Sequence, residues 1–345
     1  MPATLTDHPF MRACRREAAD YTPIWLMRQA GRYLPEYRRV RARYSFLELC
    51  RDSSAAAQVT VDTVRRLGVD AAIVFADILL PLVPMGAGLT YEKGDGPRIA
   101  RTVRSMRDVE QLHPVSVEES LAFVAQTVRL VRRELENEVP VIGFAGAPFT
   151  VASYAIEGGG SRTYVATKAL MYNDAPAWHR FMDLVADVTA HYLNMQIDAG
   201  AHAVQLFDSW AGVLSPHDYR TFVQPYSRKV IAALRKGTPV IHFGTMTGTL
   251  LEAMRDAGGD VIGLDWRVEL DEAWQRLGSG VGVQGNLDPA LLFSDRRTIR
   301  AAASDILRRA GGSPGHIFNL GHGILPETPV DNVLALIDAV HELSA

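Results

Sequence analysis

The chain has 345 residues, a formal net charge of −3 and 48% hydrophobic residues, enough to bury a large core. No apolar run approaches the ~20 residues that span a bilayer, and the first twenty residues contain no hydrophobic signal core. The two cysteines, Cys14 and Cys50, are too few for a disulfide framework or a cysteine-rich metal site. We therefore expect a soluble, cytoplasmic protein that binds neither membrane nor nucleic acid.

Short apolar runs that end in a polar residue recur along the chain. Each run is flanked by glycine, aspartate or proline and is too short for a helix, so we predict buried parallel strands. Eight such runs form the pattern; they are Ile24–Met27, Ala71–Phe75, Val139–Phe144, Ala203–Phe207, Pro239–Phe243, Val261–Leu264, Gly280–Val283 and His316–Leu320.

The segments between these runs show the spacing of amphipathic helices, several with an N-terminal Ser, Thr, Asp or Pro. Strands that alternate with helices predict an α/β fold, a closed (β/α)8 barrel of the TIM type. An open doubly wound sheet is the rival, but no GxGxxG turn follows the first strand. We expect a single domain over residues 1–345 with an N-terminal extension of about residues 1–20. The helices are predicted at Ser54–Leu67, Val117–Leu135, Thr163–Ala199, Pro216–Arg235, Thr247–Ala257, Asp295–Ala310 and Pro329–Leu343.

The loop after the first predicted strand carries Arg28 and Arg32 on either side of Gly31. Two guanidinium groups on a loop can bind carboxylate or phosphate through paired hydrogen bonds. Between residues 28 and 43, six arginines stand against one acid, Glu36, so this local positive field favours a small acidic ligand. The helical stretch that follows is expected to present a solvated face, formed by Arg38, Arg39, Arg41 and Arg43.

Polar residues also follow the other predicted strands, at the rim where barrel enzymes carry their chemistry. Asp77 ends a wholly apolar run, so its carboxylate needs a cation or N–H donors, either as a structural cap or as a ligand group. His322 lies between glycines that allow a close approach, and Tyr154 lies in the segment after the third strand; structural roles stay open for both. The remaining residues at the strand ends are Asp208, Ser209, His242, Asp265, Gln284, Asn286 and Asn319.

Metal, phosphate and Schiff-base chemistry find little support in the sequence. The triple glycine at residues 158–160 follows a helical segment instead of opening one, so we do not expect phosphate there. The paired histidines of hydrolytic zinc sites are missing, and no lysine follows a predicted strand. We expect neither a metal nor a covalent lysine intermediate.

Eight motifs, from RQAGRYLPEYR at residues 28–38 to FNLGHGILPETP at residues 318–329, closely resemble the uroporphyrinogen decarboxylase family. The resemblance covers about residues 9–340. It implies a homodimeric barrel enzyme that needs no cofactor and decarboxylates the four acetate arms of uroporphyrinogen III. The implied catalytic residues are Asp77, Arg28, Arg32 and Tyr154. The implied substrate-binding residues are Arg28, Gln29, Ala30, Gly31, Arg32, Phe46, Asp77, Tyr154, Ser209 and His322.

The resemblance also assigns roles within this set. The arginines receive the substrate carboxylates, and Asp77 accepts the pyrrole N–H groups and stabilises the cation that forms when the ring is protonated. The general acid stays open between water and a substrate carboxyl group, relayed by Tyr154 or His322. Ala76 replaces a serine that many members carry beside this aspartate.

Two alternatives belong to other classes. A corrinoid-linked methyltransferase of the same barrel family would hold zinc through a histidine and cysteines late in the barrel, whereas both cysteines here precede residue 51. A non-catalytic tetrapyrrole carrier would bind the substrate without turnover.

Overall fold

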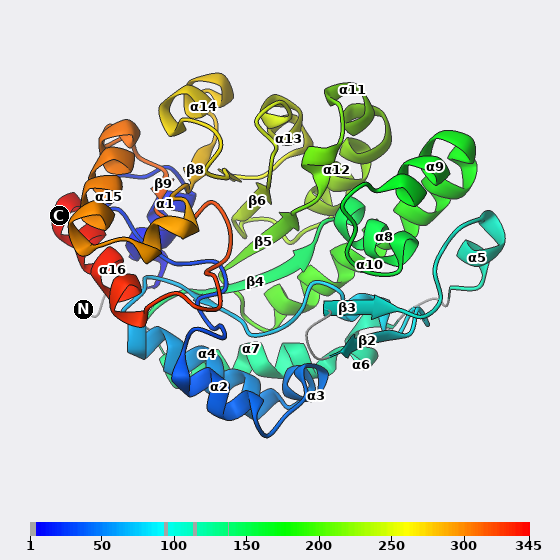
Figure 1. Ribbon diagram of the computed structural model, residues 1–345, viewed down its shortest axis with the longest axis horizontal. Coiled ribbons are helices and arrows are strands. Elements are labelled where there is room, and N and C mark those ends of the chain that lie inside the picture. The colour runs from blue at the N-terminus through cyan, green and yellow to red at the C-terminus, as the bar shows by residue number, and fades with distance from the viewer. Residues whose placement is uncertain (1–4, 93–95, 113–115, 137) are drawn as a thin grey trace.

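The protein folds around one curled, parallel sheet of seven strands with helices on its outside (Figure 1). The computed structural model describes residues 5–92, 96–112, 116–136 and 138–345. Neighbouring strands follow chain order, as right-handed strand–helix–strand units require. The strands are β1 (Ala72–Ile73), β4 (Val141–Gly146), β5 (Ala203–Asp208), β6 (Val240–Gly244), β7 (Val261–Gly263), β8 (Gly282–Gln284) and β9 (His316–Ile317).

The segment predicted as the first strand closes the barrel, although it forms only a single parallel bridge, between Ile24 and Phe318. On its other side, the Ile24 carbonyl accepts the N–H of Asp70 at 2.8 Å, just before β1. The segment is not a regular strand because side chains occupy its N–H groups. The Asp70 carboxylate accepts the Ile24 N–H at 2.7 Å, Gln29 accepts that of Leu26, and Asn319 accepts that of Met27. The predicted (β/α)8 barrel is thus confirmed, with its first strand reduced to a bridge.

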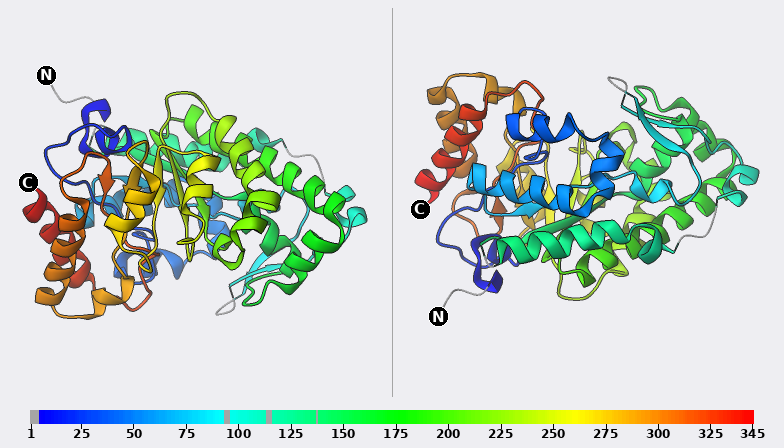
Figure 2. Two further views of the ribbon diagram at one scale, coloured as in Figure 1. Left: turned by 90° about the horizontal axis from the view of Figure 1, so that it is seen from above. Right: turned by 90° about the horizontal axis from the view of Figure 1, so that it is seen from below.

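Helices cover the outer face of the sheet, and α4 packs beside α7, the light blue and teal helices in the right-hand view of Figure 2. Most predicted helices form at the expected places. The helices beside the β-strands are α4 (Ser53–Leu67), α6 (Val117–Ser120), α7 (Ala122–Leu135), α8 (Pro148–Glu157), α9 (Val165–Asn173), α10 (Ala175–Asp198), α11 (Pro216–Asp218), α12 (Gln224–Ala232), α13 (Leu251–Ala257), α14 (Leu270–Leu277), α15 (Arg296–Ala310) and α16 (Val330–Ser344).

The prediction of one helix over Thr163–Ala199 is wrong, because the chain breaks at Asp174 between α9 and α10. The Asp174 side chain accepts the Ala177 N–H at 3.1 Å, and Pro176 occupies the first turn of α10. An aspartate cap followed by proline is a strong start signal for a new helix. The predicted helix Pro216–Arg235 is likewise divided, by a π-helical turn between α11 and α12.

A two-stranded hairpin, β2 (Leu89–Glu92) and β3 (Gly96–Ile99), was not predicted and lies beside the barrel (Figure 1). It is tied to the end of α8, because the Ile99 N–H donates to the Gly158 carbonyl at 2.9 Å. The hairpin therefore brings β3, and β2 paired with it, toward the helix that carries Tyr154.

The N-terminal residues and the end of α16 pack at the amino-terminal end of the barrel strands. α1 (Pro9–Cys14) buries Phe10 and Cys14 against β9, while residues 1–4 of the predicted extension lie outside the described residues. α2 (Pro35–Arg41), α3 (Phe46–Arg51) and α5 (Met106–Glu110) are short helices in the loops. Among the described residues, no helix has both the length and the apolar content to cross a membrane.

Candidate active site

Arg28 lies on the loop after the bridging segment, with its side chain exposed and its backbone at φ 61°. Gln29 holds this loop, since its buried amide donates to the Ala71 carbonyl at 3.0 Å and accepts the Leu26 N–H at 3.1 Å. A Cβ on Gly31 would lie 2.8 Å from the Arg28 carbonyl oxygen, so only glycine fits there. The Gln29 side-chain amide is therefore hydrogen-bonded to backbone groups, and these bonds hold the loop that carries Arg28.

The Arg28 side chain crosses to the loop after β9 and lies over Gly323. A Cβ at position 323 would approach Arg28 Cδ to 2.4 Å and Cγ to 2.6 Å. His322, next to it, is half-buried, and its ring meets Trp266 edge-on at 6.4 Å. Burial lowers the pKa of His322 to about 4, and the Arg28 guanidinium adds to the effect. The first and last segments of the barrel therefore meet through Arg28 and His322, as the shared rim predicts.

Asp77 follows β1 at the same rim. Its carboxylate accepts the Leu79 N–H at 2.7 Å, a local turn that caps the strand end. Burial raises the pKa of Asp77, while the Leu79 N–H, the Tyr91 phenol and the Arg28 guanidinium oppose that rise. The sequence left open a structural capping role for Asp77, and this hydrogen bond provides it. The bond uses one of the two carboxylate oxygens.

Tyr154 projects from α8 and lies flat against Trp210, with ring centroids 3.8 Å apart and planes 27° apart. Burial raises the pKa of Tyr154 to about 12; Asp77 raises it further and Arg28 lowers it. Asp77 and Arg28 therefore both lie within electrostatic range of the phenol. Arg28, Asp77 and Tyr154 thus gather at one rim, as predicted.

Three further predicted residues lie around this group with less to define them. Arg32 is exposed, and its charge reaches the phenol of Tyr37. Phe46 packs against Tyr91, with ring centroids 4.8 Å apart. Ser209 is half-buried after β5, and its carbonyl accepts the hydroxyl of Thr245. The contacts described for Ser209 are backbone contacts, so the role of its hydroxyl stays a prediction.

Tyr91 and Trp210 are functional candidates that sequence reasoning missed. Tyr91 comes from β2 and places its phenol beside Asp77 and its ring beside Phe46. The Asp-Gly pair at residues 95–96, after an alternating segment, is a hairpin signal that would have predicted the strand. Trp210 follows Ser209 directly and has no comparable sequence signal.

Asp265 and Asn286, two of the other residues at the strand ends, serve the fold. Asp265 is buried, pairs with Arg267 at 2.7 Å and accepts the Met246 N–H at 2.6 Å. Asn286 donates to the carbonyls of Asp265 and Val268. These hydrogen bonds connect neighbouring loops. Helix α2 was expected to present a solvated face of arginines. One of them, Arg38, also donates to the backbone carbonyls of residues 32 and 33.

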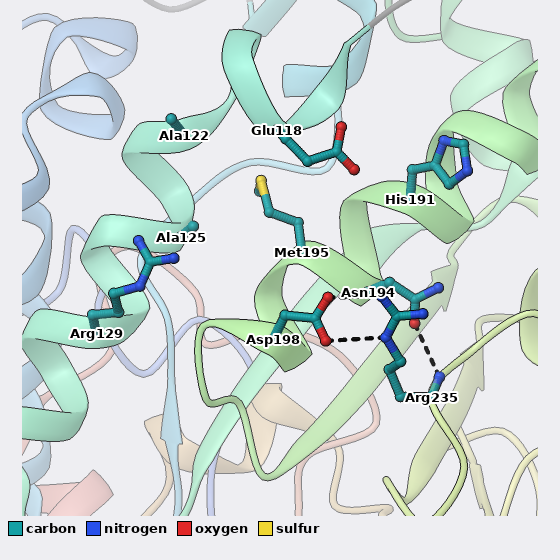
Figure 3. A pocket seen from close by; sticks show the side chains of 9 residues that line it. All are labelled: Glu118, Ala122, Ala125, Arg129, His191, Asn194, Met195, Asp198 and Arg235. Atoms are coloured by element: carbon teal, nitrogen blue, oxygen red, sulfur yellow. Dashed lines mark hydrogen bonds and ion pairs between the residues drawn. The ribbon is translucent and has the colours of Figure 1, made fainter.

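A separate cavity of about 430 Å³ opens on the outer wall between α7 and α10 (Figure 3). Its floor is an ion pair between Arg235 and Asp198 at 2.8 Å, and Asn194 accepts the Arg235 N–H at 2.9 Å. Arg129, from α7, faces it. No predicted site residue lines this cavity, so the chemistry is to be sought at the rim.

A closed barrel with an arginine, an aspartate and a tyrosine gathered at the carboxyl ends of its strands defines a barrel enzyme that acts on an anionic substrate. The family model for uroporphyrinogen decarboxylase (URO-D) matches residues 5–343. The uroporphyrinogen decarboxylase of Carboxydothermus hydrogenoformans is 54% identical over 337 residues, covering 97% of this chain and 96% of that protein. That of Sorangium cellulosum is 56% identical over 335 residues, with coverage of 97% and 96%. The chain belongs to the uroporphyrinogen decarboxylase family.

Solved structures agree on the fold. A methyltransferase from Methanosarcina mazei superimposes with a TM-score of 0.83, covering 98% of each chain, at 18% sequence identity. At that identity the likeness establishes a shared barrel and nothing about the reaction.

Proposed function

We propose that this protein removes carbon dioxide from the four acetate arms of uroporphyrinogen III and yields coproporphyrinogen III. The observation that carries the proposal is the convergence of Asp77, Arg28 and Tyr154 at one rim. It is found in a chain at least 54% identical to two relatives named uroporphyrinogen decarboxylase. An anion next to a cation suits a ring that carries N–H groups at its centre and carboxylates around it.

The reaction explains these residue types. A proton adds to the pyrrole carbon beside the acetate arm, and the ring becomes an iminium-like cation. The C–CO2 bond then breaks, its electron pair neutralises the ring, and carbon dioxide leaves. The exocyclic carbon gains a proton to become a methyl group, while the ring carbon loses the one it had gained. The substrate is its own electron sink, so the reaction needs no cofactor.

Each predicted residue has a place in this scheme. Asp77 accepts the pyrrole N–H groups and stabilises the ring cation in an enclosed site, where electrostatic effects are large. Arg28 and Arg32 bind carboxylates and orient the arm that reacts. Gln29 positions the loop. The remaining substrate contacts are assigned to Ala30, Gly31, Phe46, Tyr154, Ser209 and His322.

An anaerobic turnover assay tests the proposal. Purified protein, stripped of metal, is incubated with uroporphyrinogen III, and coproporphyrinogen is measured by chromatography; Asp77→Asn serves as the inactive control. We expect product from the wild type alone. Binding without product would favour the tetrapyrrole carrier, and activity restored only by zinc or a corrinoid would favour the methyltransferase. Among the described residues, no contact favours either alternative.

We also propose a cytoplasmic homodimer that joins through the rim. Three large apolar side chains are exposed near it: Val165 (67%), Tyr172 (52%) and Met246 (45%). Lys168 ties α9 to this side, since its ammonium group donates to the Val213 carbonyl at 2.7 Å. Val165→Glu should shift the sedimentation coefficient toward the monomer, whereas Leu343→Glu, at the other end of the barrel, should not. A wild type that sediments as a monomer at micromolar concentration would contradict the dimer.

A further inference from the structure

A buried hydrogen-bond chain runs beneath the candidate site, from the end of β5 to the first turn of α8. Asp208, the last residue of β5, is fully buried and accepts the hydroxyl of Thr150 at 3.1 Å. The same hydroxyl oxygen accepts the backbone N–H of Trp210 at 3.2 Å. Thr150 is itself fully buried. One hydroxyl therefore joins a strand end, a helix and the loop that carries the tryptophan.

This hydrogen-bond chain adjoins the aromatic residues Trp210 and Tyr154 of the candidate site. Thr150 and Tyr154 are four residues apart in α8 and so lie on the same face of the helix. Trp210 is pinned to the first of these residues through its backbone and stacks on the second through its ring, at 3.8 Å. Tyr164 also contacts the indole edge-on, with ring centroids 5.1 Å apart. Moving the Trp210 backbone would therefore move the surface against which Tyr154 rests.

The surroundings of Asp208 make the threonine its main partner. His242, on β6, has its Nε2 4.0 Å from the carboxylate, and neither of its ring nitrogens has a hydrogen-bond partner among the described residues. Tyr219, in the π-helical turn, and Ser227, on α12, also lie on this side. Burial raises the pKa of Asp208 to about 7 and lowers the pKa of His242 to about 4, so the histidine is neutral near pH 7. Within the part of the chain that the structure describes, no lysine or arginine pairs with this carboxylate.

We propose that Asp208 and Thr150 are positioning residues that hold the Trp210–Tyr154 stack in register with the reacting groups. When Asp208 is ionised it can only accept, so the Thr150 O–H must point toward it. The lone pairs of that hydroxyl are then aimed at the Trp210 N–H. The inference rests on the proposed role of Tyr154 and extends it to a support that does not touch substrate.

The test replaces the hydroxyl by a methyl group of the same shape. Thr150→Val should lower kcat for uroporphyrinogen about 10- to 100-fold, the scale of a misplacement near 1 Å, with little change in KM. Its near-UV circular dichroism should lose the band that Trp210→Phe also loses. Thr150→Ser keeps the hydroxyl and should restore both. Thr127→Val, which removes a buried hydroxyl bonded to a backbone carbonyl in α7, is the matched control.

A second variant keeps the test decisive if Thr150→Val does not fold. Asp208→Asn retains the shape of the side chain but cannot ionise, so it should flatten the dependence of kcat on pH within about one unit of 7. Wild-type kcat in Thr150→Val, or an unchanged pH profile in Asp208→Asn, would overturn the inference. If Tyr154→Ala loses turnover while Thr150→Val does not, the support alone is refuted. If Tyr154→Ala turns over normally, the role proposed for Tyr154 fails instead.

Discussion

Gly323→Ala tests the placement of Arg28 without changing the arginine itself. The added Cβ would lie 2.4 Å from Arg28 Cδ, whereas ordinary contact begins at 3.4 Å. Arg28 must therefore move by about 1.0 Å, the difference between these two distances. The side chain is exposed and can swing toward solvent, so stability should change by less than about 0.5 kcal/mol. The cost should fall on binding and orientation of the substrate carboxylate.

The expected loss follows from that displacement. A shift near 1 Å in an orienting group costs up to about 100-fold, so kcat/KM should fall about 10- to 100-fold, or ~1.4–2.7 kcal/mol of transition-state stabilisation. Initial rates with uroporphyrinogen III and thermal melts provide the measurement. Gly280→Ala is the matched control, since its Cβ would meet nothing within 4 Å. Unchanged kcat/KM in Gly323→Ala, together with inactive Arg28→Ala, would refute a productive position over Gly323.

Three further predictions concern charge. Asp77→Asn should abolish most turnover yet melt no lower at pH 7, because a carboxyl group with a raised folded pKa costs stability above its unfolded pKa; a lower melting temperature would contradict this. Tyr91→Phe removes a phenol that lowers the pKa of Asp77, so the acid limb of the kcat profile should move to higher pH, and an unmoved limb would argue against the contact. His341, whose pKa is raised by its 2.8 Å hydrogen bond to Asp70, stabilises the fold most below about pH 6.5. The melting-temperature loss in His341→Asn should shrink as pH rises through the folded pKa; a constant loss would contradict the titration.

The placement of Arg28, Asp77 and His322 at one rim was predictable because all parallel strands of a barrel end there, whereas Tyr154 comes from helix α8. A buried apolar strand fixes the position of the polar residue that follows it, and this position does not depend on how the loops pack. Gln29 was not predictable in the same way. Its motif marks it as part of the substrate loop, but only the structure reveals that its amide is consumed by the backbone of two other segments.

Contacts between loops were the least accessible to sequence. Tyr91 reaches Asp77 from a hairpin outside the barrel, and Trp210 reaches Tyr154 through a backbone bond to Thr150. No periodic pattern in the sequence predicts either pairing, because each depends on how one loop packs on another. The broken first strand has a similar origin, because side-chain acceptors, two of them from distant segments (Asp70 and Asn319), took the place of a neighbouring backbone.

Protonation states narrow the identity of the general acid. A general acid works best with a pKa near the pH at which the enzyme operates. Burial places the pKa of His322 near 4 and that of Tyr154 near 12, so the imidazole is neutral and the phenol firmly protonated at pH 7. Neither group is therefore a strong proton donor at pH 7, which favours water or a substrate carboxyl group as the source. The role proposed for Asp77 requires an ionised carboxylate while the ring becomes a cation. The pyrrole N–H groups of the bound substrate would offset the burial that disfavours its charge.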